Sequence, residues 1–287
     1  MRGITVWITA AVVAASFLFF LVLESLLPLR RAVESKVRRL GRNLTIAGLG
    51  LATVTILQTP VLLPVSTWAA RHEVGLLALL PLPGWAAVLG TILLLDYTLW
   101  FWHWLNHKVP FFWRFHRVHH VDRDLDTSTG IRFHFGELGF SVVFRAAQIV
   151  AIGADPFGVG IYQLLLFASV LFHHSNSRLP LGLERWLVRI VVTPRMHGIH
   201  HSDYRNETNS NWSSLLSVWD FLHRTARLDV PQAEIVIGVP AYSRPQRVTL
   251  GRVLALPFRG QREDWHRPDG RPADRPPPGP DPTLLAP

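Results

Sequence analysis

The sequence predicts an all-α integral membrane protein, a helical bundle with about four to five spans and a histidine-rich helical cap on the cytoplasmic side. Charged residues make up 17% of the 287 residues, whereas about 25% is usual in soluble domains. Apolar residues gather in long runs, and the mean hydropathy is +0.22. Eleven of the fourteen histidines lie between His103 and His201, where these runs end or are connected.

Five apolar runs account for the predicted spans, since a helix needs ~20 residues to cross the ~30 Å hydrocarbon core. They cover residues 4–28, 43–64, 85–105, 138–154 and 157–174. We expect the first to be a retained helix rather than a signal peptide, because its apolar stretch is too long and no A-x-A site follows it. The fourth contains Arg145 and Gln148, so a re-entrant or bundle-buried helix is an alternative there.

Lysine and arginine predict the orientation of the bundle. Nearly all of them fall in residues 29–42, in 106–137 and after 175, and cytoplasmic loops carry such an excess. With five spans these three segments share the cytoplasmic side and the N-terminus lies outside. The crowded histidines then all lie at cytoplasmic helix ends or in cytoplasmic loops.

The chain divides by composition into three parts. Residues 1–84 are predicted to form N-terminal membrane helices, and residues 85–258 a catalytic domain that contains the crowded histidines. Residues 259–287 are rich in Pro, Arg and Asp, so they are expected to be a disordered tail.

Composition also excludes several classes of protein. The chain has no cysteine, which excludes disulfide scaffolds, thiolate metal sites and thiol nucleophiles. A net charge of +9 can indicate nucleic-acid binding. Here the basic residues flank apolar runs, and no aromatic-interleaved basic patch is present, so we expect a membrane partner and no nucleic acid.

Three histidine clusters predict a metal site. They are His103–His107, with spacing i,i+4, and His116–His119–His120 and His197–His200–His201, each with spacing i,i+3,i+4. On a helix, residues three and four apart lie about 5–6 Å from each other on one face. Two imidazoles can therefore share one ion, and adjacent imidazoles can serve two ions. His72, His223 and His266 stand apart and are read as ordinary surface or core residues.

The number of histidines favours two metal ions. A tetrahedral zinc uses four ligands at most, whereas the clusters together with His174 offer nine. Imidazole suits Zn, Cu, Fe and Ni alike, so the spacing leaves the metal open.

Over roughly residues 90–225 the sequence resembles the fatty acid hydroxylase / sterol desaturase superfamily of membrane His-box di-iron oxygenases. The three clusters match its HxxxH, HxxHH and HxxHH boxes. Further matches are Asp96, Trp113-Arg114-Phe115 before the second box, Arg132-x-His134-x-x-Glu137, His174-Ser175-Asn176, Thr193-Pro194 and Trp219-Asp220.

The resemblance implies a set of site residues. The implied metal ligands are His103, His107, His116, His119, His120, His174, His197, His200 and His201, with His134 either a ligand or a support. His173 is expected to support a ligand. Asp96, seven residues before His103, is expected to accept a proton from a ligand histidine, and Glu137 to hold Arg132 or a ligand histidine.

The resemblance also implies the chemistry. It implies a non-haem di-iron lipid monooxygenase with two iron ions, for which zinc is a possible substitute, and with O2 as co-substrate. A lipid from the bilayer (sterol, fatty acyl or ether lipid) would be hydroxylated or desaturated. No dinucleotide fingerprint is present, so electrons would come from another protein of the ferredoxin or cytochrome b5 type. The alternatives are a membrane zinc-dependent hydrolase and a metal-binding membrane protein without catalysis.

Overall fold

The fold is described by a computed structural model of residues 2–260, 263–273 and 275. These residues form helices joined by loops, and none of the described residues forms a β-strand beyond isolated bridges. The long helices are α1 (Arg2–Leu26), α2 (Lys36–Thr53), α3 (Thr59–Arg71), α4 (Gly84–Lys108), α6 (Phe135–Ile152) and α7 (Pro156–His174). The short helices are α5 (Pro110–His120), α8 (Leu181–Leu187), α9 (Pro194–His200), α10 (Arg205–Thr208), α11 (Val218–Leu222) and α12 (Leu250–Ala255).

Four helical segments are long and apolar enough to cross a membrane: Lys36–Leu79, Gly84–Lys108, Phe135–Ile152 and Pro156–His174. The described apolar part of α1, Ala11–Leu26, is shorter. The prediction of an all-α membrane bundle with about four to five spans is therefore confirmed. The predicted 138–154 span is the unbroken 18-residue helix α6, which packs against α3 and α4 as a member of the bundle.

The second span extends beyond its predicted end. The sequence predicted that this span ends at residue 64, but the helix continues from α2 through a π-helical turn, Val54–Gln58, into α3, which ends at Arg71. Pro60 lies in the first turn of α3, where its missing N–H costs little. The π turn supplies the local change in hydrogen bonding that lets the helix pass the proline.

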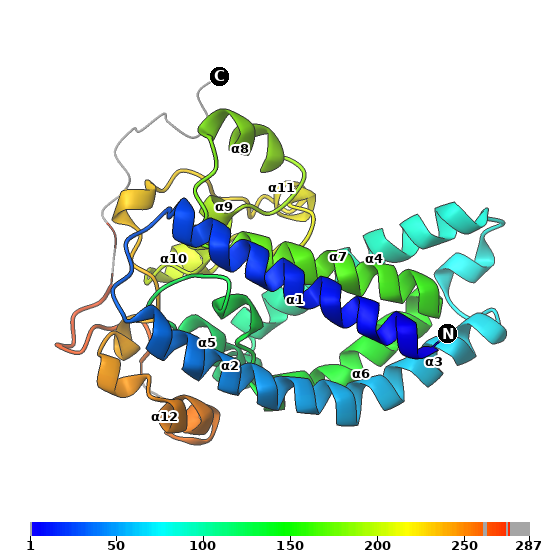
Figure 1. Cartoon of the computed structure of the whole chain (residues 1–287), viewed down its shortest axis with the longest axis horizontal. Helices are drawn as coiled ribbons and strands as arrows, with labels where there is room; N and C mark the ends of the chain where they lie inside the picture. Colours follow the sequence, from blue (N-terminus) through cyan, green and yellow to red (C-terminus); the bar gives the residue numbers. More distant parts are fainter. Residues whose placement is uncertain (1, 261–262, 274, 276–287) are drawn as a thin grey trace.

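The long helices lie beside one another, and the short helices gather at one end of the bundle (Figure 1). In this view α1 runs along α7, with which it is in contact, and α2 with α3 runs along the opposite side. The carboxyl ends of α4 and α7 and the beginning of α2 meet the short helices. The cap predicted from the sequence is thus a helical cap at one end of the bundle.

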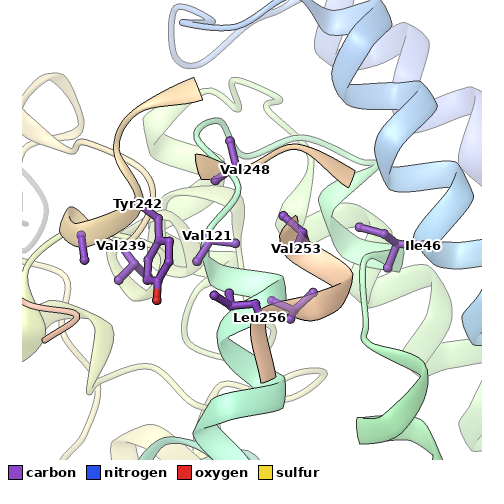
Figure 2. Packing of buried hydrophobic residues seen from close by; sticks show 9 residues of the cluster. Ile46, Val121, Val239, Tyr242, Val248, Val253 and Leu256 are labelled. Carbon is purple, nitrogen blue, oxygen red and sulfur yellow. The ribbon is translucent and has the colours of Figure 1, made fainter. Parts of the chain in front are cut away.

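One apolar core joins the cap to α2 (Figure 2). Val118 and Val121 from the end of α5 pack against Ile46 of α2 and against residues from the C-terminal part of the chain, which are Val239, Ala241, Tyr242, Val248, Val253 and Leu256. Val118 and Val121 flank His119 and His120 along the chain. This core therefore fixes the position of the second histidine cluster.

A buried ion-pair network holds the turn after the second cluster. Arg39 of α2 is 1% exposed and donates to the carboxylates of Asp122 and Asp126. Asn43 and Arg42 donate to Asp122 as well. These charge-assisted hydrogen bonds hold α2 against the segment that follows His120. The N-terminal helix α2 is thus packed against the histidine-rich part of the chain.

Part of the predicted disordered tail is ordered. Asp264 forms an ion pair with Arg117 at 2.6 Å and accepts a hydrogen bond from Trp113 at 2.7 Å. Trp265 stacks on Trp113, with 5.9 Å between ring centroids. Composition indicates disorder on average, but these buried polar and aromatic partners hold residues 263–273 on the cap. Residues 261–262, 274 and 276–287 of the predicted tail lie outside the described residues.

Candidate metal centre

Nine histidines converge into two adjoining groups at the cap end of the bundle. The first group, here called group one, is His103, His107, His116, His120 and His200. The second, group two, is His119, His174, His197 and His201. Within each group the candidate ligand nitrogens all lie within 4.8 Å of one another. The groups abut, since the rings of His120 and His201 are 4.3 Å apart. Each group could hold a metal ion.

The helical spacing decides which histidines share a group. Every i,i+4 pair stays together: His103 with His107, His116 with His120, and His197 with His201. The histidine at the intermediate position, His119 or His200, belongs to the other group. One helix can therefore present ligands to two neighbouring ions, because adjacent residues project about 100° apart around a helix of 3.6 residues per turn.

Local sequence places each cluster at a helix end. Pro110 starts α5 at a position where proline is favoured, so that its last turn carries His116, His119 and His120. Thr193 caps α9 by accepting a hydrogen bond from the N–H of Met196. His103 and His107 close α4, and His174 closes α7.

The hydrogen bonds in group one leave its nitrogens free for an ion. Nδ1 of His103 donates to the carbonyl of Trp212 at 2.7 Å, and Nδ1 of His200 to that of Ser210 at 2.7 Å. Nδ1 of His116 faces Glu137 at 2.9 Å. The Nε2 atoms of all five histidines are buried without a hydrogen-bond partner among the described residues. Metal-bound histidines have this arrangement, with one nitrogen fixed by a partner and the other directed at the ion.

The nitrogens of group two lie even closer together. Nε2 of His174 lies 3.0 Å from Nε2 of His119 and 3.0 Å from Nε2 of His197. Nε2 of His197 in turn lies 3.1 Å from Nε2 of His201. Nitrogens bound to one ion at about 2.1 Å lie roughly 3.0–3.4 Å apart. Nδ1 of His174 already donates to the carbonyl of Val170, so its Nε2 carries a free lone pair. These contacts fit a shared ion.

Burial keeps the histidines neutral. Removal from water lowers the pKa of His200 to about 3. It also lowers the pKa values of four further histidines well below 6.5, and the neighbouring histidines lower them more. These four are His119, His120, His197 and His201. A neutral imidazole offers the lone pair that a metal requires. The site is therefore ready to bind metal at neutral pH.

Comparison with known proteins agrees with this geometry. Residues 88–225 match the model of the fatty acid hydroxylase family, and this segment contains every histidine of the two groups. Residues 88–225 belong to the fatty acid hydroxylase family. The resemblance inferred from the boxes is thereby confirmed, and no solved structure matches the chain.

Three curated proteins to which the chain is similar are named as lipid hydroxylases or monooxygenases. Alkylglycerol monooxygenase of Xenopus tropicalis is 29% identical over 55% of this chain and 32% of its own length. Ornithine lipid hydroxylase OlsE of Rhizobium tropici is 34% identical over 47% of this chain and 40% of its own length. Mouse cholesterol 25-hydroxylase is 26% identical over 49% of this chain and 46% of its own length. The chain thus spans about a third to a half of the length of the relatives it matches.

The fold brings together nine of the ten histidines predicted to be ligands. The tenth, His134, lies outside both groups. Its Nδ1 accepts a hydrogen bond from Gly136 and caps α6, while its Nε2 faces the carbonyl of Leu254. Both ring nitrogens of His134 are therefore engaged away from the two groups. His173 packs beside the ligand candidates His174 and His197.

The two predicted carboxylates differ in what they contact. Glu137 faces His116, one of the two partners expected for it. Among the described residues Asp96 forms no hydrogen bond with a histidine, and the hydroxyl of Tyr162 faces it at 3.5 Å. It accepts hydrogen bonds from Trp219 at 2.7 Å and from the N–H of Leu216 at 3.0 Å, and thereby holds the loop beside α4. The same-face spacing to His103 is real, but it brings Asp96 two turns deeper into the bundle, where this loop is its neighbour.

Asp220 has a supporting role that the sequence reasoning did not assign. It is 0% exposed and accepts hydrogen bonds from Trp100 and from the N–H groups of Trp212 and Ser213. Since the carbonyl of Trp212 holds His103, Asp220 fixes the partner of a ligand candidate. The Trp219-Asp220 motif was the available signal, but its spacing in the chain gives no indication of this contact.

A cavity of about 180 Å³ opens beside both groups. Its histidines include His103 and His116 of group one and His119, His174 and His197 of group two. The rest of its wall is mostly apolar and comes from α4, α6 and α7, including Leu99, Trp102, Leu138, Leu166 and Val170. Such a cavity can bring an apolar chain up to the histidines.

Proposed function

We propose that this protein is a membrane-bound lipid monooxygenase that uses two histidine-bound iron ions and O2 to hydroxylate or desaturate a lipid. One observation carries the proposal: two abutting groups of histidine nitrogens face an apolar cavity that is walled by membrane helices. The relatives support it, since their names describe lipid hydroxylases and monooxygenases.

The histidines would hold the metal ions, and the metals would supply O2 activation for attack on a C–H bond. The chain itself would orient the ligands and exclude water from the site. Glu137 and the carbonyls of Trp212 and Ser210 would fix the ring orientation of three ligands. Leu99, Trp102 and Leu166 would exclude water and align the lipid chain.

Iron is proposed over zinc because the proposed function requires redox chemistry, which zinc does not perform. The electrons would come from a separate protein of the ferredoxin or cytochrome b5 type. The excess of Lys and Arg in 29–42, in 106–137 and after 175 supports a cytoplasmic location for the metal centre.

The test combines a metal count with oxygen uptake. The protein is purified in detergent, loaded anaerobically with iron, and assayed for metal content and for O2 consumption with a reductant and an extract of membrane lipids. Two irons per chain and O2 uptake that requires both reductant and lipid would support the proposal. One zinc per chain, with lipid hydrolysis and no O2 uptake, would replace it with the hydrolase alternative.

A further inference from the structure

Arg145 occupies an unusual position in the middle of the membrane helix α6. It lies ten residues from the start of the helix and seven from its end. It lines the cavity beside the histidines and also a smaller adjoining cavity, whose wall includes Leu62, Ile149 and Val159. Leu99 and Leu166 line both cavities as well, so Arg145 stands where the two spaces meet.

The guanidinium has no hydrogen-bond or ion-pair partner among residues 2–260, 263–273 and 275. Glu137 and Tyr162 interact with the guanidinium electrostatically, but neither forms a hydrogen bond or ion pair with it. One carboxylate oxygen of Glu137 faces His116 and the other has no hydrogen-bond partner among the described residues, while the hydroxyl of Tyr162 faces Asp96. Gln148, one turn further along α6, donates to Thr98.

An unpaired cation at this depth is costly. A charge inside the bilayer normally has a partner or lines a pathway, and it is a default candidate for function. Arginine binds carboxylates through two parallel hydrogen bonds and stays charged even when buried. A bound anion would pair with the guanidinium directly, which Glu137 does not do, and the cavity gives that anion access to it.

We propose that Arg145 binds the carboxylate of a single-chain fatty acid whose acyl chain runs through the cavity toward the histidines. This inference rests on the proposed function and names the substrate class for it. A cavity of about 180 Å³ suits one acyl chain segment, with the rest of the lipid outside it.

The position of Arg145 also sets the distance to the reacting carbon. Glu137, which contacts His116, lies eight residues before Arg145 on the same helix. Eight residues span about 12 Å of helix at 1.5 Å per residue. A carboxylate held by Arg145 therefore places a carbon in the middle of the acyl chain, on the order of 10 Å away, beside the metal centre.

The binding test uses tritiated palmitic acid and the purified, metal-free protein in detergent. The compared proteins are the native chain, Arg145→Gln, Arg145→Lys and the control Arg71→Gln, which alters an exposed arginine at the end of α3. Palmitic acid is expected to bind Arg145→Gln roughly tenfold or more weakly than the native chain. Arg145→Lys is expected to be intermediate, and Arg71→Gln unchanged.

Competition with 1-hexadecanol and methyl palmitate tests the carboxylate assignment. Both are expected to compete poorly with palmitic acid for the native chain and to bind Arg145→Gln as well as they bind the native chain. Equal binding of palmitic acid to the native chain and Arg145→Gln would overturn the proposal. The proposal would also be overturned if Arg145→Gln weakened the binding of 1-hexadecanol as much as it weakened the binding of palmitic acid.

Folding and activity are separated from binding. Without ligand, Arg145→Gln is expected to unfold at the same or a higher temperature, because it removes an unpaired charge. A lower melting temperature would mean that Arg145 serves the fold and would contradict the proposal. If palmitic acid binds through Arg145 but the iron-loaded protein consumes no O2, the proposed function fails and the carboxylate site stands.

Discussion

Glu137 contacts His116 through Nδ1 at 2.9 Å, and both side chains are buried. This contact turns the Nε2 of His116 toward the other nitrogens of group one. Carboxylate partners of this kind orient the ring and make it a stronger ligand.

Glu137→Gln is expected to weaken metal binding in group one about 10–100-fold, because the amide lacks the negative charge of the carboxylate. Metal titration of the purified variant in detergent measures the effect. Glu234→Gln, which alters an exposed carboxylate paired with Arg275, is the matched control and should bind metal like the native chain. Unchanged affinity in Glu137→Gln would show that the contact does not support a ligand.

Pairs of histidine substitutions test how the ligands are divided. His116→Ala with His120→Ala removes two ligands of group one, so one metal ion per chain is expected to remain in group two. His120→Ala with His201→Ala removes adjacent residues of different groups, so both ions are expected to be weakened or lost. Metal content by elemental analysis distinguishes the two variants, and an equal loss in both would refute the division.

Asp96→Ala is expected to destabilise the fold more than it affects metal binding. The substitution leaves the N–H groups of Trp219 and Leu216 without acceptors, at a cost of about 1–3 kcal/mol for each buried group. Thermal unfolding and metal content should be measured on the same preparation. A stable variant that has lost its metal would indicate instead that Asp96 acts on a ligand histidine.

Gly198 allows Arg30 to reach the third histidine cluster. A Cβ built on Gly198 would lie 1.7 Å from Nη2 of Arg30, which donates to the carbonyl of Pro194 at 3.0 Å. Gly198→Ala should therefore displace the guanidinium and lower the free energy of unfolding by about 1–3 kcal/mol. When Gly198→Ala is introduced into a chain that already carries Arg30→Ala, it should lower the free energy of unfolding much less, because the guanidinium that it would displace is absent. Additive effects in this double-mutant cycle would rule out the contact as the cause.

Acid is expected to destabilise the metal-free protein. Burial lowers the pKa of His200 to about 3 and lowers the pKa of His119 well below its ordinary value of 6.5. Below about pH 6.5 the unfolded chain therefore binds more protons than the folded one. Stability that is present above about pH 6.5 is thus lost as the pH falls toward 3. Melting temperatures of chelator-treated protein at about pH 7.5 and about pH 5 test this, and equal values would contradict it.

Much of the centre could be predicted from local sequence. Each cluster lies within one helical segment, so its i,i+3 and i,i+4 spacing fixes a common face, and long apolar runs fix the spans. The pairing of His120 with His200, or of His119 with His174, joins segments far apart in the chain. Spacing in the sequence carries no information about such pairs.

The supporting residues show the same limit. Asp96 shares a helix face with His103, yet it accepts hydrogen bonds from Trp219 and Leu216, because the returning loop lies at its depth. His134 belongs to a matched motif but caps α6. Asp264 lies in a segment whose composition predicts disorder, but Arg117 and Trp113 hold it.

By itself the sequence determined that this protein is a helical membrane bundle and predicted that three histidine clusters form one metal site, because periodicity and hydropathy act over a few residues. Only the tertiary structure decided how nine histidines divide into two groups, which partners hold their rings, and that Arg145 faces the cavity unpaired. These features depend on which helices meet at the cap end of the bundle, and that is settled by packing between distant segments.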